Sequence, residues 1–152
     1  MRTCIITLFL AASVLSAPTR QPAAADSDDA KNAIKIVLDE QVRGWNEGNI
    51  EKYMAGYVRS DSLRFASGGN VSYGWQAAFD RYKKRYPDKA AMGALEFSDL
   101  DIRLICDEAA LVFGKWKLRR EKDEPWGLFT LLLRKTGDGW RIVHDHTSSA
   151  ED

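Results

Sequence analysis

The sequence has few of the residues that usually identify a chemistry. It contains two cysteines and two histidines, and its 22 basic residues are balanced by 22 acidic ones. Cys4 lies in an apolar amino-terminal stretch, so Cys106 is the one cysteine expected in the folded domain, which excludes an internal disulfide. The charge balance gives no basic surface of the kind that binds nucleic acid or an anionic membrane.

The amino-terminal region also lacks a hydrophobic run long enough to span a membrane. Its apolar stretch runs from Cys4 to Val14, well short of the roughly 20 residues that a bilayer requires. Arg2 precedes this stretch and small residues follow it, a pattern typical of a secretory signal peptide. The small residues predict cleavage after Ser16 or after Ala25.

These features predict an exported protein with one folded domain. We expect residues 1–25 to be a signal peptide and linker, and residues 26–152 to form a single domain, since a chain of this length suits one domain. The mature protein is then expected to be secreted or periplasmic, and to have no contact with a membrane after the signal is removed.

Hydrophobic periodicity predicts the order of the secondary structure elements. Apolar residues recur at helical spacing up to Trp45, and alternate in most of the later segments. The predicted helices cover residues 26–46, 50–57 and 74–86, and the predicted strands 62–67, 71–73, 95–106, 109–120, 127–135 and 140–148. The hydrophobic face changes between Phe97 and Leu100, which predicts a bulge. This order indicates an α+β domain, a cone-shaped curved antiparallel sheet with three helices on its concave face.

The segment from Gly127 to Lys135 is apolar on both of its faces, which indicates a sheet covered on both sides. Three helices suffice for one side only. The other side of the sheet is expected to carry Leu128, Leu132 and either Val112 or Leu111. We therefore expect a homodimer that pairs through this sheet face.

The last predicted strand follows a Gly-Asp-Gly turn and alternates between two faces. One face is expected to carry Trp140, Ile142, His144, His146 and Ser148, and the other to carry Arg141, Val143, Asp145 and Thr147. The first face begins apolar and ends in two imidazoles and a hydroxyl. This pattern favours the back wall of a pocket that becomes polar at its mouth.

Several segments resemble a known superfamily. Trp45 to Asn49 is similar to its W-N-x-G-D segment, Leu63 to Phe65 with the glycines that follow is similar to its first hairpin, and Trp140 to Ser148 is similar to the closing strand of an uncharacterised SnoaL-like branch. The chain thus resembles the nuclear transport factor 2-like superfamily over residues 30–148. This superfamily includes ketosteroid isomerase and SnoaL-type polyketide cyclases. The resemblance implies the cone fold and supports a dimer.

Isomerases of that superfamily use a strand carboxylate as base and an oxyanion hole formed by a tyrosine and a protonated carboxylic acid. In this sequence the position of that tyrosine falls near Trp45, whose indole is a weaker donor. The position of the base falls near Asp61, in a polar loop. We therefore carry none of these catalytic residues over, because one fold hosts unrelated functions.

Aromatic and polar residues that could line a pocket are spread over most of the predicted elements. They either bind a ligand or fill the cone, and they are Trp45, Tyr57, Arg64, Phe65, Tyr73, Trp75, Tyr82, Trp116 and Ser148. Buried hydroxyls of Tyr57 and Tyr82 could orient a ligand. Arg64 is either an anion clamp that faces the pocket or the partner of a carboxylate on the sheet.

His144 and His146 permit three interpretations. They could bind a metal together with Asp99 or Asp101, donate hydrogen bonds to a ligand carbonyl or carboxylate at the pocket mouth, or fix the strand end against neighbouring groups. A metal site needs more ligands than the sequence places nearby. We therefore predict no metal and no cofactor.

The sequence favours an exported dimeric domain that binds a small apolar or aromatic molecule. An alternative is a SnoaL-like isomerase, cyclase or hydrolase that uses His144 or His146 as acid–base. A third hypothesis is a protein-association module with a filled cavity.

Overall fold

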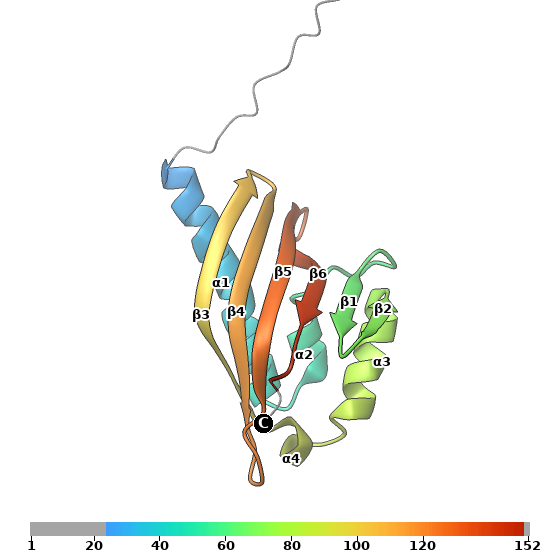
Figure 1. Cartoon of the computed structure of the whole chain (residues 1–152). Coiled ribbons are helices and arrows are strands. Elements are labelled where there is room, and N and C mark those ends of the chain that lie inside the picture. Colours follow the sequence, from blue (N-terminus) through green and yellow to red (C-terminus); the bar gives the residue numbers. More distant parts are fainter. Residues whose placement is uncertain (1–23, 151–152) are drawn as a thin grey trace, which may run out of the picture.

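The computed structural model describes residues 24–150, and these form helices on one side of a single curved sheet (Figure 1). The elements are α1 (Ala24–Asn46), α2 (Ile50–Met54), β1 (Arg64–Ser67), β2 (Asn70–Tyr73), α3 (Trp75–Arg85), α4 (Lys89–Met92), β3 (Ala94–Cys106), β4 (Ala109–Arg119), β5 (Trp126–Thr136) and β6 (Gly139–Thr147). The predicted α+β class is confirmed. The predicted signal peptide lies almost entirely outside the described residues.

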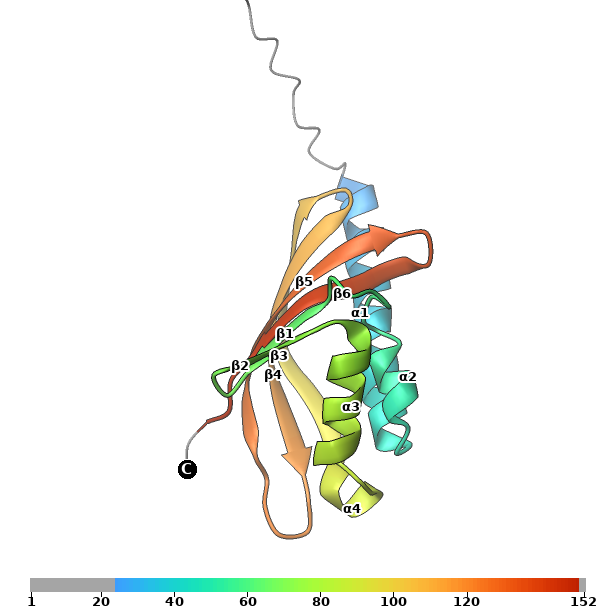
Figure 2. The same ribbon diagram turned by 90° about the vertical axis from the view of Figure 1, so that its right-hand side faces the viewer.

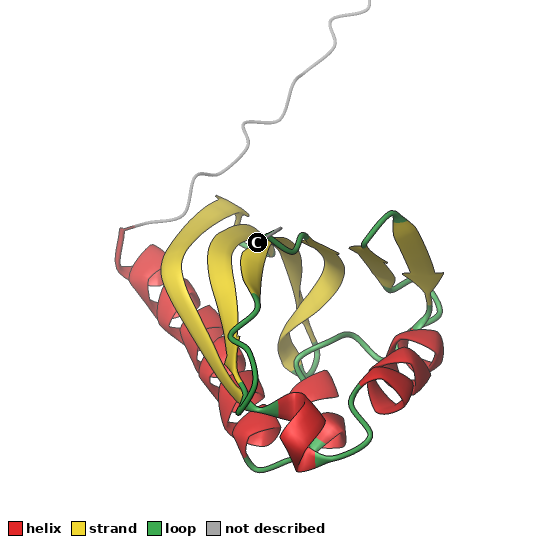
Figure 3. Cartoon of the chain, turned by 60° about the horizontal axis from the view of Figure 1, so that its bottom comes forward, coloured by secondary structure: helices red, strands yellow, loops and turns green. Residues whose placement is uncertain are grey.

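The six strands form one sheet in the order β2-β1-β6-β5-β4-β3. Strands β3 to β6 form the expected antiparallel meander, whereas β1 pairs with β6 in parallel. The sheet arches over the helices, which cover its concave face (Figures 2 and 3). Among residues 24–150, no helix lies on the other face. In the part of the chain that the structure describes, no helix combines the length and apolarity that a membrane crossing needs.

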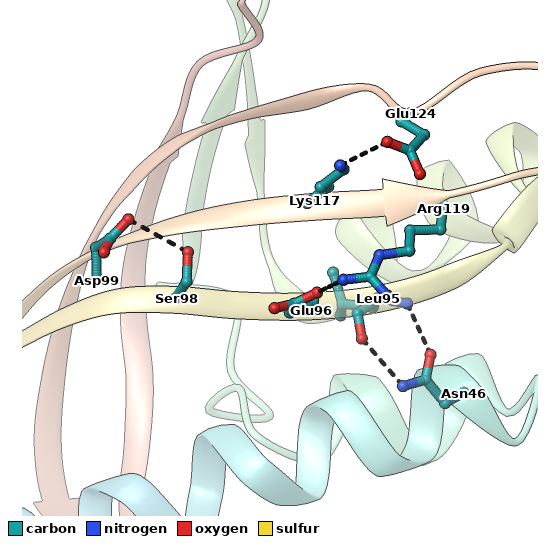
Figure 4. Close-up of polar contacts among 8 residues, drawn as sticks. All are labelled: Asn46, Leu95, Glu96, Ser98, Asp99, Lys117, Arg119 and Glu124. Atoms are coloured by element: carbon teal, nitrogen blue, oxygen red, sulfur yellow. Dashed lines mark hydrogen bonds and ion pairs between the residues drawn. The ribbon is translucent and has the colours of Figure 1, made fainter.

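Helix α1 is attached to the sheet by one apolar stripe and one polar clamp. Ile34, Leu38 and Trp45 lie on one face at helical spacing and are almost fully buried. Burial of each such side chain is worth roughly 1.5–3 kcal/mol. At the end of the helix, the side-chain amide of Asn46 donates to the carbonyl of Leu95 at 3.0 Å and accepts from its N–H at 2.7 Å (Figure 4). These two hydrogen bonds fix the start of β3 against the end of α1.

Gly44 allows α2 to cross close to α1. A Cβ at this position would lie 2.7 Å from the Cβ of Lys52 and 2.8 Å from the backbone nitrogen of Tyr53. Any larger residue would therefore push α2 away. The close crossing brings Tyr53, which lies in α2, and Tyr57, which lies just after it, into the space beneath the sheet.

Strand β3 contains the bulge that the sequence predicts. Its register with β4 shifts between Ser98 and Asp101, and Asp99 has a φ of 54°. The bulge moves the inward face from Phe97 to Leu100 and bends the strand. The ion pairs drawn on this sheet region, Glu96 with Arg119 and Lys117 with Glu124, are largely exposed (Figure 4). They contribute little to stability.

Two local features differ from the sequence-based expectation. The short helix α4 follows Pro87 and is capped by Asp88, whose carboxylate accepts from the N–H of Ala91 at 2.8 Å. Four residues are too few to produce a hydrophobic period. The second difference lies in β6, where the expected strict alternation of side chains is wrong.

Val143 is an extra residue in β6. Leu132 pairs with His144 and Leu133 pairs with Ile142, so Val143 has no partner on β5. On its other edge, β6 changes neighbour at the same point. The N–H of Ile142 donates to Gly56 at 2.9 Å, and its carbonyl accepts from Val58 at 2.9 Å, whereas the residues after Val143 pair with β1. The bulge joins these two pairings.

The bulge reverses the facing of the second half of β6. Trp140 and Ile142 face inward as expected, but the next buried residue is Asp145 rather than His144. A one-residue shift exchanges every side chain between the two faces of a strand. A carboxyl group therefore takes the inward place that the sequence assigned to imidazoles.

Candidate ligand-binding site

A cavity of about 270 Å³ lies between the concave face of the sheet and the helices. Its lining combines aromatic and aliphatic side chains with about as much polar surface, so the cavity suits a ligand that has both apolar and polar parts. The lining residues are Gln41, Trp45, Tyr53, Tyr57, Phe65, Ser67, Gly68, Asn70, Arg81, Tyr82, Arg85, Tyr86, Leu95, Phe97, Trp116, Leu118, Phe129, Leu131, Asp145, Thr147 and Ser149. The volume suits a molecule of one or two rings.

The cavity has an exposed mouth and a buried floor. Gly68, Asn70, Arg85 and Ser149 line it and are solvent-exposed, so they mark the opening. The floor residues are almost fully buried and include Gln41, Tyr57 and Asp145. A ligand would therefore enter past a polar rim and reach a carboxyl group at the far end.

Asp145 is the central polar group of the floor. It is 5% exposed, and its Oδ2 accepts a hydrogen bond from the Tyr57 hydroxyl at 2.8 Å. Its Oδ1 is buried and has no hydrogen-bond partner among the residues that the structure describes. Burial raises the pKa of this carboxyl from 3.8 to about 7, and the Tyr57 hydrogen bond and the Arg81 charge oppose the rise only in part. At neutral pH the group thus exists both protonated and ionised.

Three tyrosine hydroxyls form a chain that ends on Asp145. The hydroxyls of Tyr82 and Tyr53 lie 3.2 Å apart, and those of Tyr53 and Tyr57 lie 3.3 Å apart. A hydroxyl has one proton. Because Tyr57 donates its proton to Asp145, it can only accept from Tyr53, and Tyr53 in turn can only accept from Tyr82. The donors of the chain therefore all point toward the carboxyl.

The same burial keeps these phenols neutral. Burial and then the charge of Asp145 raise the pKa of Tyr53 and Tyr57, and burial with Tyr53 and Asp145 raises the pKa of Tyr82. Neutral phenols remain hydrogen-bond donors over the whole physiological range. The chain thus stabilises the ionised form of Asp145, but burial prevails.

Five of the residues predicted from sequence to bind a ligand line the cavity. They are Trp45, Tyr57, Phe65, Tyr82 and Trp116. Trp45 also has a structural role, because its indole N–H donates to the carbonyl of Met92 at 3.1 Å. The indole of Trp116 donates to the carbonyl of Ser148 at 2.9 Å and so ties the carboxyl-terminal segment to β4.

The other predicted ligand residues lie elsewhere. Arg64 and Tyr73 are exposed partners across β1 and β2, with the guanidinium 5.8 Å from the ring centroid, and neither lines the cavity. Trp75 is buried in the core, stacked on Phe79, and donates to the carbonyl of Met54 at 3.0 Å. Ser148 takes part through its carbonyl, which accepts from Trp116, and does not line the cavity.

His144 and His146 lie on the face of the sheet that is turned away from the cavity. Neither lines it, and His144 pairs across the sheet with Arg64 on one side and Leu132 on the other. The prediction that imidazoles form the pocket mouth is wrong, and the bulge at Val143 is the reason. Among residues 24–150, no three His, Cys, Asp or Glu side chains gather in a way that could hold a metal ion.

Several polar residues of the lining were not predicted from the sequence, and Asp145, Tyr53, Arg81 and Arg85 are the ones that matter most for the site. The sequence-based prediction places Asp145 on the face opposite the pocket, and Tyr53, Arg81 and Arg85 are not among its candidate ligand residues. Arg81 and Tyr82 with Arg85 and Tyr86 occupy one side of α3 at helical spacing. That repeated Arg-Tyr spacing is the signal that could have located them.

The fold is that of the nuclear transport factor 2-like superfamily. A crystal structure of an NTF-2 like protein of unknown function from Shewanella oneidensis MR-1 is similar at 40% identity, with a TM-score of 0.75. The match covers 78% of this chain and 98% of that chain. The superfamily resemblance noted from the sequence is thereby confirmed.

Two more distant structures share this architecture. A ketosteroid isomerase-like protein from Erwinia carotovora atroseptica has 14% identity and a TM-score of 0.64, over 80% of this chain and 96% of that chain. A nuclear transport factor 2 superfamily protein from Salmonella enterica has 16% identity and a TM-score of 0.66, over 83% of this chain and 94% of that chain. At such identities the likeness concerns the fold alone.

The family model described as a SnoaL-like domain matches residues 34–151. The chain therefore belongs to the SnoaL-like family. A sequence comparison with curated proteins finds no match.

Proposed function

We propose that this protein is an exported, dimeric domain that binds a small, mainly aromatic molecule in the cavity beneath its sheet. The observation that carries this proposal is the combination of aromatic walls with a buried, incompletely hydrogen-bonded carboxyl. An unpaired buried polar atom is costly, and a ligand that bonds to Asp145 Oδ1 removes that cost. A cavity that only filled space would have no need of this group.

Tryptophan fluorescence provides a direct test, because Trp45 and Trp116 line the cavity. Titration with small one-ring and two-ring aromatic compounds is expected to change the emission in a saturable manner and to raise the unfolding temperature. The Leu131→Phe variant, which adds volume inside the cavity, is expected to weaken binding at least tenfold.

A matched control is available one residue away. Leu132 follows Leu131 on β5 but lies on the opposite face. The Leu132→Phe variant is expected to bind the probes as the wild type does. Equal binding by wild type and both variants, or no saturable binding by any of them, would contradict a ligand in this cavity.

A second candidate function is catalysis of proton transfer, and the pKa of Asp145 favours it. A carboxyl with a pKa of about 7 both accepts and returns a proton near neutral pH. Asp145 is a better candidate for the acid–base role than His144 or His146, since it lines the cavity and they do not. The test is exchange of solvent deuterium into the carbon next to the carbonyl of an aryl ketone. Exchange should be lost in Asp145→Asn and retained in His144→Asn; the reverse pattern would reject this function.

The dimer is supported by the apolar character of the convex sheet face. Phe113 is 42% exposed and Leu128 is 41% exposed, and Leu111 and Leu132 lie beside each other in the register of β4 and β5. A patch of this kind is typical of an interface between identical subunits. Light scattering after size exclusion at micromolar concentration is expected to give twice the mass of one chain, and a monomer would refute the dimer.

Export is supported by the amino-terminal pattern alone. Expression of the full chain in a bacterial host, followed by fractionation and amino-terminal sequencing, is the test. We expect the protein outside the cytoplasm with a new amino terminus after Ser16 or Ala25. An intact chain retained in the cytoplasm would refute this part of the proposal.

A further inference from the structure

Two arginines line the cavity on the same side of α3. Arg81 and Arg85 are four residues apart, which is one helical turn, and both line the cavity. Among the described residues neither forms an ion pair, whereas Arg43, Arg103, Arg119 and Arg120 each pair with an acid. Two guanidinium groups at the cavity are thus available to a ligand.

The charge inside the cavity is therefore positive. Asp145 is the one acid among the lining residues, and its carboxyl lies at the buried floor, while Arg85 lies at the exposed mouth. With Asp145 protonated the lining carries two positive charges, and with it ionised it still carries one. A cavity of one sign concentrates ligands of the opposite sign.

Neighbouring rings hold both guanidinium groups in place. Arg81 lies over the ring of Phe65 at 5.3 Å, and one of its N–H groups donates to the carbonyl of Ser67 at 3.4 Å. The Nε of Arg85 donates to the hydroxyl of Tyr86 at 3.3 Å. Each guanidinium has five N–H groups, so most of them remain free for a ligand. This arrangement orients the two groups before any ligand arrives.

From this geometry we infer that the ligand of the cavity is a small aromatic carboxylate. Its carboxylate is bound by Arg81 and Arg85, its ring lies between the aromatic walls, and a polar substituent at its far end bonds to Asp145. A planar carboxylate matches the forked donors of a guanidinium. The inference rests on the proposed ligand-binding function and narrows it to one class of ligand.

The test uses two probes of equal size and different charge. These are 6-hydroxy-2-naphthoate and 6-(hydroxymethyl)-2-naphthol, which share the far hydroxyl, and their binding is measured by calorimetry on the wild-type protein and on variants. The wild type is expected to bind the carboxylate at least tenfold more tightly than the alcohol. Arg81→Gln and Arg85→Gln are each expected to weaken carboxylate binding about tenfold and to change alcohol binding less than twofold.

Arg64→Gln is the matched control. Arg64 is exposed on β1 and does not line the cavity, so its loss is expected to change neither affinity. Arg81→Lys keeps the charge and guards against misfolding of the glutamine variant; it should retain part of the preference for the carboxylate.

The possible outcomes distinguish the carboxylate assignment from the proposed ligand-binding function on which it rests. Equal affinity for both probes, or equal loss of both in the arginine variants, would overturn the carboxylate assignment and leave a ligand-binding cavity. Failure of both probes to bind the wild type would overturn the carboxylate assignment together with the proposed function.

Discussion

The two faces of β6 carry different kinds of polar group, although these alternate in the sequence His144-Asp145-His146. The inward group, Asp145, is buried at the floor of the cavity and bonded to Tyr57. The outward groups lie on the convex face, where His144 is partly buried and His146 is exposed. One extra residue, Val143, decides which of them faces the ligand. The chemistry of the site thus depends on a backbone irregularity as much as on residue types.

The largest difference between the faces should appear in the dependence of stability on pH. The pKa of Asp145 is about 7 in the folded protein and about 3.8 when unfolded. The stability gained by holding the proton is complete below pH 3.8 and is lost as the pH rises to about 7. At pH 8 the Asp145→Asn variant should therefore exceed the wild type in free energy of unfolding, by at most about 4 kcal/mol.

Urea unfolding at pH 4 and pH 8 checks this prediction, since the gain should disappear at pH 4. His146→Asn is the control on the outward face and should match the wild type at pH 8. A gain that is the same at both pH values would show that the ionisation of Asp145 is not its cause.

The second effect concerns the outward face alone. A Phe113→Glu substitution places a charge in the expected interface, and two-fold symmetry repeats it. The dissociation constant of the dimer should rise at least 100-fold, which corresponds to about 3 kcal/mol. Sedimentation equilibrium measures it, and Lys84→Glu on α3 is the control. An unchanged dimer would mean that the subunits pair through another surface.

The third prediction concerns the hydroxyl that serves Asp145. The Tyr57→Phe substitution removes the hydrogen bond that the Asp145 carboxyl accepts from Tyr57. Among the described residues, both oxygens of Asp145 are then without a partner. The free energy of unfolding at pH 8 should fall by roughly 1–3 kcal/mol, and by less at pH 4, where the carboxyl is neutral. Tyr73→Phe, at an exposed outward position, should change it by less than about 0.5 kcal/mol. Equal losses in the two variants would argue against a special role for the buried hydroxyl.

The smallest effect concerns His144. Partial burial, and then the charges of Arg64 and His146, lower its pKa below the ordinary 6.5. The neutral ring is favoured in the folded state, so its small contribution is present above pH 6.5 and is lost as the pH falls. Proton NMR of the ring should give a midpoint below 6.5 that moves upward in Arg64→Gln. A midpoint that does not move would exclude the charge of Arg64 and leave burial and the charge of His146 as the causes.

Much of the architecture could be predicted because apolar residues mark the phase of their elements. The change of face between Phe97 and Leu100 indicated the bulge of β3, and the register shift between Ser98 and Asp101 confirms it. The long strands and the helix before Trp45 were predicted nearly to their ends for the same reason. Side chains that must be buried reveal which way a strand faces.

The bulge of β6 could not be found in this way. After Ile142 the strand continues with Val143 and then with polar residues, and polar residues do not show which side of a strand is buried. The regular alternation of Trp140 and Ile142 was therefore extended one residue too far. What sets the bulge is the change of neighbour from the Gly56–Val58 segment to β1, a long-range pairing that no local pattern contains.

Gly127 has a consequence for how homologues of this protein can be compared. A Cβ here would lie 1.9 Å from the carbonyl oxygen of Ser148, which also accepts the Trp116 indole. The tail that borders the cavity opening can follow this path only beside a residue without a side chain. A homologue with a larger residue at the equivalent position must route its tail elsewhere. The residue at this single position therefore distinguishes homologues that keep this cavity opening from those in which the opening has a different structure.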